Sequence, residues 1–121
     1  MRQQSPAEQI KQFLDFVDES RKLYDLAEEN VKTEEKRQTD LLHEIEFSSN
    51  SKERNKAATC LHKCRADRRR YKDEMKRQEQ IVIFFNNDQN RKVLNQLRQL
   101  LGRQRKEEEY LNSERTYKTR V

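Results

Sequence analysis

The feature that most constrains this chain is a seam of regularly spaced residues that begins at Ile10 and continues for more than five heptads. Its positions follow alternating steps of three and four: Ile10, Phe13, Val17, Ser20, Tyr24, Ala27, Val31, Glu34, Gln38, Leu41, Ile45 and Ser48. This period places its residues on one face of a long α-helix and is typical of a coiled-coil seam. The start SPAE offers Ser5 as a cap, Pro6 at the first helical position and Glu8 for a capping box. The sequence therefore predicts a helix over about residues 6–48.

Two further helices are expected after this one. The polar run FSSNSKER interrupts the seam, and either Asn50 with Glu53 or Ser51 alone can cap a second helix. A second, thinner seam then reads Ala57, Leu61, Cys64, Arg68, Tyr71, Met75, Gln78, Val82 and Phe85. The break NNDQN follows, with Asp88 as the expected cap of a leucine-rich third helix. We expect these helices over about residues 51–86 and 88–109, and a tail over 110–121.

Two long helices joined by a short polar turn fold back into an antiparallel hairpin. A turn near residues 49–50 pairs positions whose numbers sum to roughly 99, so Tyr24 is expected near Met75. The fold class predicted is all-α: one helical domain over residues 1–121, built as a long coiled-coil-like hairpin. A shorter third helix packs at one end of the hairpin, and a C-terminal tail follows.

The run IVIFF, residues 81–85, is the only long apolar stretch in a chain that is 40% charged. It is far shorter than the roughly 20 residues that a membrane-spanning helix needs, and the chain has no second strand for it to pair with. In the expected register Val82 and Phe85 face the first helix, while Ile81 and Phe84 face the third. The run is therefore predicted to be the place where three helices meet.

The composition excludes several classes of protein. Only 31% of the residues are hydrophobic, Gly and Pro occur once each and Trp is absent, so neither a large globular core nor a turn-rich β-sheet is expected. The start MRQQSPAEQI lacks the apolar stretch of a secretory signal. Two cysteines do not form a disulfide framework, and a reducing cytoplasm is the expected location.

Catalytic and metal sites are not expected. The chain has two histidines, no glycine-rich phosphate loop and no recognisable nucleophile–base set, so we expect no enzyme and no cofactor. Cys60, His62 and Cys64 lie close together, but a structural zinc site needs four such ligands and no second pair has a matching spacing. The alternative interpretation is two small buried hydrophobic residues beside a surface histidine.

The charge is divided unevenly along the chain. Residues 1–48 have a net charge of −5, and residues 49–106 have a net charge of +11. The most basic segment, CRADRRRYKDEMKR at 64–77, is therefore expected either to contact phosphates or to pair with Glu28, Glu34, Glu35 and their neighbours. The candidate binding residues for a nucleic acid or an acidic partner are Arg65, Arg69, Arg70, Lys72, Lys76, Arg77, Arg103, Arg105, Lys118 and Arg120. Of these, Arg65, Arg69, Lys72 and Lys76 are expected to remain exposed on the outer face.

Three functions follow from these patterns. The first is a non-enzymatic interaction protein that binds a larger protein or ribonucleoprotein complex as an adaptor or inhibitor, a role that suits a small phage or bacterial accessory protein. The second is a nucleic-acid-binding protein that uses the basic second helix and the tail. The third is a homodimeric coiled-coil spacer, in which Glu34, Gln38 and Arg68 specify the register between copies. None of these involves a membrane.

Overall fold

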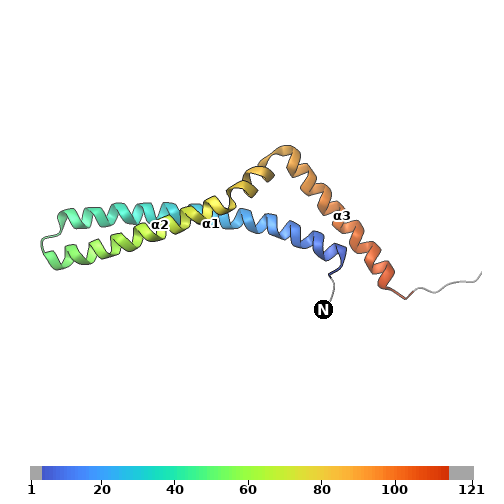
Figure 1. Cartoon of the computed structure of the whole chain (residues 1–121), viewed down its shortest axis with the longest axis horizontal. Coiled ribbons are helices and arrows are strands. Elements are labelled where there is room, and N and C mark those ends of the chain that lie inside the picture. Colours follow the sequence, from blue (N-terminus) through green and yellow to red (C-terminus); the bar gives the residue numbers. More distant parts are fainter. Residues whose placement is uncertain (1–3, 115–121) are drawn as a thin grey trace, which may run out of the picture. The chain divides into compact units, whose positions relative to one another are not determined.

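The structure is a computed structural model that describes residues 4–114, and this part of the chain is built from three helices (Figure 1). Helix α1 spans Pro6–Phe47, α2 spans Ser51–Asn86 and α3 spans Asp88–Asn112. The predicted fold class is confirmed: α1 and α2 form the helical hairpin, and α3 is the shorter third helix. Helix α3 continues past the expected end at residue 109, so Tyr110 is helical and does not belong to the tail. The candidates Lys118 and Arg120 lie outside the described residues.

Each helix begins at a side-chain cap. Ser5 Oγ accepts a hydrogen bond from the Glu8 N–H at 3.2 Å, and Asn50 Oδ1 accepts one from the Glu53 N–H at 2.8 Å. The expectation that Asp88 caps the third helix is wrong. The cap is Asn87, whose extended backbone and side-chain oxygen, 2.8 Å from the Gln89 nitrogen, leave Asp88 as the first helical residue.

The chain divides into two compact units. The hairpin unit comprises residues 19–84 and therefore most of α1 and α2. The α1–α3 unit combines the described residues up to Asp18 with those from Phe85 onward. The sequence-based expectation of one helical domain over residues 1–121 stays a prediction.

In the hairpin unit α1 and α2 run antiparallel (Figure 1). The Ser20 hydroxyl donates a hydrogen bond to Gln78 Oε1 at 2.5 Å, and the Cys64 thiol donates one to the Glu34 carbonyl at 3.2 Å. In both pairs the residue numbers sum to 98, close to the expected 99. The apolar part of this seam is thin, since its buried hydrophobic residues are Ala27, Val31, Ala57, Leu61 and Cys64.

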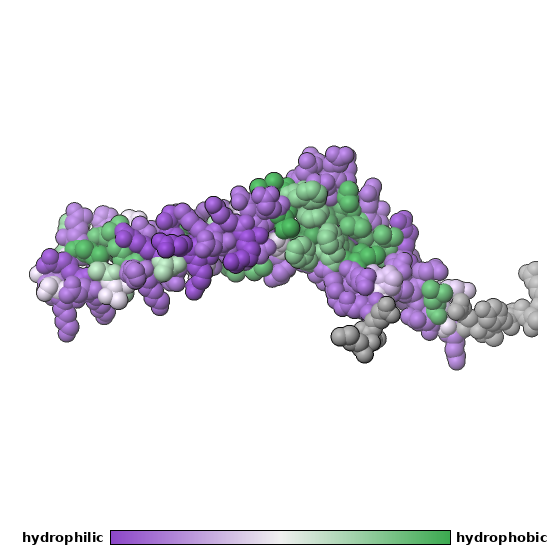
Figure 2. Space-filling model, in the orientation of Figure 1, coloured by the Kyte–Doolittle hydropathy of each residue, from purple (hydrophilic) through white to green (hydrophobic). Residues whose placement is uncertain are grey.

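The α1–α3 unit has the denser apolar core. Its buried residues are Ala7, Leu14, Val17, Leu94 and Leu101, with Ile10, Phe85 and Leu97 packed against them. Figure 2 shows apolar residues (green) gathered between the start of α1 and α3. Leu94, Leu97 and Leu101 share one face of α3, and α3 packs this apolar face against α1.

The apolar run 81–85 differs from its predicted role. Phe85 packs against the core of the α1–α3 unit, and its ring lies 6.2 Å from that of Phe13 in an edge-to-face arrangement. The expectation that the third helix covers Phe84 is wrong, because Phe84 is 58% exposed, as is Ile83. Five consecutive residues of a helix point in all directions around its axis, so two neighbouring helices cannot bury them all.

Candidate functional site

A stripe of four cations runs along one face of α2 in the hairpin unit. Arg65, Arg69, Lys72 and Lys76 follow steps of four, three and four residues, and all four side chains are exposed, as expected from the sequence. Such steps align side chains on one helix face. These four residues are called the basic stripe below. At about 1.5 Å per residue the stripe is about 16 Å long.

The acidic first helix does not neutralise the basic stripe. In the segment 64–77 the ion pair that reaches α1 is made by Arg68, whose Nη2 lies 3.0 Å from Glu35 Oε1. Within the described residues, no salt bridge or hydrogen bond engages a side chain of the basic stripe. The expected pairing of this segment with Glu28 and Glu34 therefore accounts for none of the four stripe cations.

Two other basic candidates, Arg70 and Arg77, form ion pairs with carboxylates of α2 itself. Arg70 Nη2 lies 3.5 Å from Asp67 Oδ1, and the Arg70 guanidinium lies 5.3 Å from the centre of the Tyr71 ring. Arg77 Nη1 lies 2.5 Å from Glu74 Oε2. Hydrogen bonds from Gln78 and Arg77, together with the Arg77 charge, lower the pKa of the Glu74 carboxyl, so this pair stays charged at neutral pH. Arg70 and Arg77 are thus less available to a partner than the stripe is.

The basic stripe borders a hollow of about 340 Å³ between the two helices of the hairpin unit. Arg65, Arg68, Arg69 and Lys72 line it from α2, and Gln38 lines it from α1. The residues that line the hollow include no carboxylate. Glu35 does not line it but accepts a hydrogen bond from Arg68, which does. A site of this composition can bind an anion such as a phosphate group.

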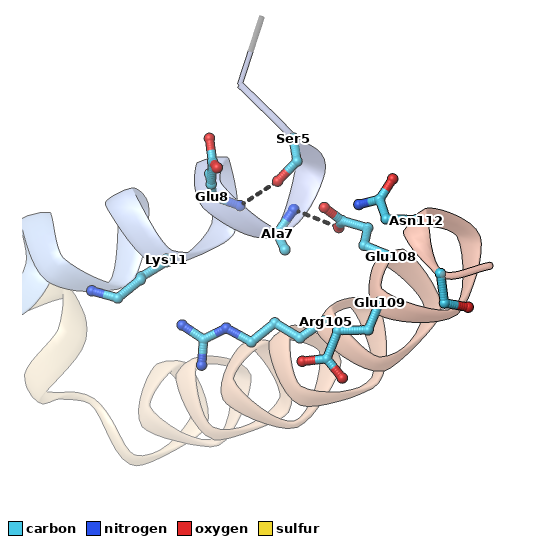
Figure 3. Close-up of a pocket in the computed structure, with 9 residues that line it drawn as sticks. Ser5, Ala7, Glu8, Lys11, Arg105, Glu108, Glu109 and Asn112 are labelled. Carbon is cyan, nitrogen blue, oxygen red and sulfur yellow. Dashed lines mark hydrogen bonds between the residues drawn. The ribbon is translucent and has the colours of Figure 1, made fainter.

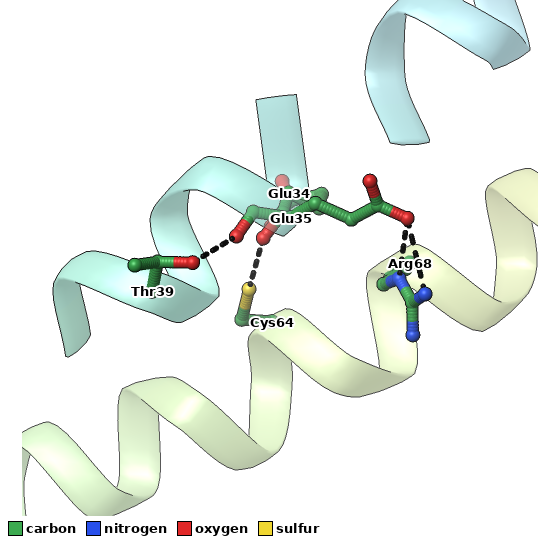
Figure 4. A network of polar contacts seen from close by, with 5 residues as sticks. All are labelled: Glu34, Glu35, Thr39, Cys64 and Arg68. Atoms are coloured by element: carbon green, nitrogen blue, oxygen red, sulfur yellow. Dashed lines mark hydrogen bonds and ion pairs between the residues drawn. The ribbon is translucent and has the colours of Figure 1, made fainter. Parts of the chain in front are cut away.

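A polar layer holds this part of α2 against α1 (Figure 4). Arg68 donates two hydrogen bonds to the Glu35 carboxylate, from Nε at 3.3 Å and from Nη2 at 3.0 Å. The Cys64 thiol donates to the Glu34 carbonyl. The layer fixes where the basic stripe lies along the hairpin, because both contacts set the register of the two helices.

The same layer buries the Cys64 thiol. Cys64 has no exposed surface, and burial, helped by the neighbouring Glu34, raises the pKa of its thiol to about 11. Cys60 is a half-buried free thiol and His62 is exposed. Across residues 4–114, no cluster of three or more His, Cys, Asp or Glu side chains is placed to hold a metal ion.

The remaining described candidates belong to the α1–α3 unit. Arg103 lines a shallow hollow on α3 together with Val93, Leu97 and Leu100. Arg105 lines a pocket of about 520 Å³ between the start of α1 and the end of α3 (Figure 3). The structure therefore does not place Arg103 or Arg105 in the basic stripe, and their binding role stays a prediction.

The pocket in Figure 3 contains an interaction that the sequence did not reveal. Glu108 Oε2 accepts a hydrogen bond from the backbone N–H of Ala7 at 3.0 Å, across 101 positions of the chain. A hydrogen bond with Ser5, with smaller contributions from Gln104 and the Ala7 N–H, lowers the pKa of the Glu108 carboxyl. An anionic side chain at a helix N-terminus also interacts favourably with the helix dipole. The only local signal was the acidic run EEE at 107–109, which does not identify a partner.

The pocket does not suit a ligand whose charges are all of one sign, because its own lining carries both signs. Its lining includes the cations Lys11 and Arg105 and the carboxylates of Glu8, Glu108 and Glu109. The natural anion site there, the N-terminus of α1, is already occupied by Glu108. The pocket is best described as part of the contact between α1 and α3.

Several large apolar side chains are also exposed. In the α1–α3 unit these include Phe13, Phe16 and Val93, with Phe16 51% exposed. At the tip of the hairpin unit His43 and Phe47 stack with ring centres 6.2 Å apart, and Phe47 is 76% exposed. The sequence placed Phe13 in the first seam, and the structure leaves it 42% exposed with its ring 6.2 Å from that of Phe85.

None of the helices traced over residues 4–114 has the length and apolar character required to cross a bilayer. No protein-family model, curated protein or solved structure shows a significant match to this chain.

Proposed function

We propose that this chain is a non-enzymatic interaction protein that binds nucleic acid, free or within a ribonucleoprotein, through the basic stripe of α2. One observation carries the proposal: Arg65, Arg69, Lys72 and Lys76 are exposed on one helix face and have no acidic partner among the described residues. Cations paired with carboxylates would already be neutralised. Unpaired cations on one face attract a polyanion, since each contact with a phosphate releases condensed counterions.

The charge distribution within the hairpin supports this proposal. Residues 51–86 carry eleven Lys and Arg against five Asp and Glu, and the basic stripe gathers four of the exposed cations on one face. Rigid spacing matters because a partner then meets all four charges without ordering them first. The stripe sits on a helix that is held in register by Arg68–Glu35 and Cys64–Glu34.

A role as an enzyme is not part of this proposal. The hollow beside the stripe is lined by cations and one amide, and none of these is a nucleophile next to a base. The thiol of the polar layer beside the stripe, Cys64, is buried and its pKa is raised. The free cysteines also suit a reducing cytoplasm, which we propose as the location.

Fluorescence anisotropy with labelled 20-mer oligonucleotides at low salt tests the proposal. The triple variant Arg65→Glu, Arg69→Glu, Lys72→Glu is expected to lose at least about 100-fold in affinity, since three phosphate contacts become repulsive. The matched control, Lys22→Glu, Lys36→Glu, Lys52→Glu, changes the net charge equally at exposed positions off the stripe. The affinity of this control variant for the oligonucleotide is expected to fall much less. Absence of binding by the unmodified chain at low salt, or equal losses in both triple variants, would overturn the proposal.

A second candidate function is docking to a protein partner as an adaptor or inhibitor. The observation that favours it is the exposure of Phe13, Phe16, Val93 and Leu100 in the α1–α3 unit. Exposed large apolar residues grouped on one unit are typical of protein interaction sites.

Capture experiments with two variants separate these functions. Phe16→Ser with Val93→Ser removes apolar surface, and the stripe triple variant removes charge. A protein captured by the unmodified chain and by the stripe variant, but not by the apolar variant, supports docking through the α1–α3 unit. Capture that is lost only with the stripe, or after nuclease treatment, contradicts this second candidate. Light scattering of the purified chain tests the homodimeric spacer, which predicts twice the 14.8 kDa mass.

A further inference from the structure

The surroundings of the basic stripe narrow the class of nucleic acid that fits it. We infer that the stripe binds the phosphate backbone of a double-stranded nucleic acid and does not read its bases. This inference rests on the proposed function, and three features of the hairpin unit carry it.

The first feature is the scarcity of aromatic side chains in the segment of α2 that carries the stripe. Tyr71 is the one aromatic residue between positions 64 and 77. It is half-buried, and the Arg70 guanidinium lies 5.3 Å from its ring centre. Proteins that hold single strands stack successive bases on aromatic side chains, and that stacking contributes about 1–3 kcal/mol per base. The stripe offers charge without stacking, so a single strand gains little there beyond its phosphate contacts.

The second feature is the position of α1 beside the stripe. Gln38 of α1 lines the same hollow as Arg65, Arg69 and Lys72, so the stripe lies at the border between the two helices. Packed helices have axes about 8–10 Å apart and diameters of about 10–12 Å, which makes the pair about 18–22 Å wide. The major groove of B-DNA is about 12 Å wide and admits one helix. The two helices side by side are therefore too wide for the groove, and with the stripe at their border the hairpin fits across the backbone.

The third feature is the fixed linear arrangement of the charges. Four cations span about 16 Å on a helix that is already ordered. A duplex carries one charge per about 1.7 Å of axis, twice the axial charge density of one of its strands, and its backbone is stiff. Because both the helix and the duplex backbone are already rigid, the cations can contact the phosphates without first ordering either backbone. A flexible single strand has to be ordered along the stripe, and this ordering costs free energy.

The salt dependence gives the inference a quantitative form. Four phosphate contacts predict that the logarithm of the association constant falls with the logarithm of salt concentration with a slope of about −3.6 for B-DNA. Lys76→Ala is expected to reduce the magnitude of this slope by about 0.9. Arg70→Ala is the matched control: Arg70 is paired with Asp67, and its loss is expected to leave the slope unchanged. Circular dichroism checks that both variants keep their helicity.

The test measures anisotropy of the full chain with a 20-base-pair duplex, each of its single strands, a second duplex of unrelated sequence and an RNA duplex. We expect at least about fivefold tighter binding of duplexes than of single strands, and a difference below about threefold between the two DNA sequences. Tight binding of either the DNA or the RNA duplex supports the inference. Single strands that bind equally well or better, or a tenfold difference between the two sequences, would overturn it while leaving the proposed function intact. If none of the probes binds at low salt, the proposed function itself fails.

Discussion

The carboxylate of Glu108, near the end of α3, lies 3.0 Å from the backbone nitrogen of Ala7, in the first turn of α1. A side chain from the end of the described chain thus satisfies a free N–H group at its beginning. Helix N-termini leave four such donors without intrahelical partners, and Ser5 satisfies another one through the Glu8 N–H. Together with the core leucines of α3, this contact holds α3 against the start of α1.

Replacement of Glu108 by Gln is expected to destabilise the α1–α3 unit. Glutamine keeps the size of the side chain but removes the negative charge that the Ala7 N–H and the helix dipole favour. We expect the melting temperature, measured by circular dichroism at neutral pH, to fall by roughly 2–6 °C. Glu107→Gln is the control, since Glu107 is exposed and lies on another side of α3. Equal effects of the two substitutions would show that general charge, and not the cap, is responsible.

The same contact predicts a pH dependence. Hydrogen bonding by Ser5, Gln104 and the Ala7 N–H lowers the pKa of Glu108 below its ordinary value of 4.5. A carboxyl whose pKa is lower in the folded state stabilises the fold above the unfolded-state pKa, and this contribution is lost as pH falls through the folded-state value. The difference in melting temperature between the unmodified chain and Glu108→Gln should therefore be full at pH 6 and shrink below about pH 4.5. A difference that grows on acidification would contradict the assigned role of Glu108.

The apolar run 81–85 provides a matched pair of substitutions. Phe85→Asp places a charge against Phe13 and the core of the α1–α3 unit, and we expect the free energy of unfolding to fall by about 2–4 kcal/mol. Phe84→Asp changes a side chain that is 58% exposed and should cost less than about 1 kcal/mol. Urea titrations followed by circular dichroism measure both values. A free energy of unfolding that Phe85→Asp leaves unchanged would disprove the packing of Phe85 against the core of the α1–α3 unit.

The two cysteines should differ in reactivity. Cys64 has no exposed surface and its thiol pKa is raised to about 11, whereas Cys60 is half-buried. Only the thiolate attacks an alkylating reagent, so at pH 7.5 Cys60 should react at least about tenfold faster than Cys64. Mass spectrometry of peptides after timed treatment with iodoacetamide measures both rates, with urea-unfolded chain as the control. Equal rates in the folded chain would mean that the seam around Glu34 and Cys64 opens readily.

The helices and the hairpin register could be predicted because their signals are local. The heptad steps from Ile10 onward define a helix face, and the short turn at Asn50 determines which residues of the two helices meet. Pairing sums of 98 for Ser20–Gln78 and Glu34–Cys64, against the expected 99, show how closely these two rules determine the hairpin. The choice between Asn87 and Asp88 as the cap was missed, because both residue types cap helices equally well.

The site could be predicted only in part. The sequence identified the basic segment and the face that holds Arg65, Arg69, Lys72 and Lys76, since exposure on a helix follows from its period. It left open whether these cations pair with the acidic first helix. Pairing depends on side-chain reach across the hairpin, and the structure gives Arg68 a partner in α1 while Arg70 and Arg77 find theirs within α2.

The sequence by itself therefore determined the helices, their register and the basic character of α2, because each follows from spacing along the chain. Only the tertiary structure decided that Glu108 caps α1, that Phe84 is exposed while Phe85 packs in the core, and which cations have no partner. These outcomes depend on atoms that approach one another from distant parts of the chain. A one-dimensional period carries no information about such distances.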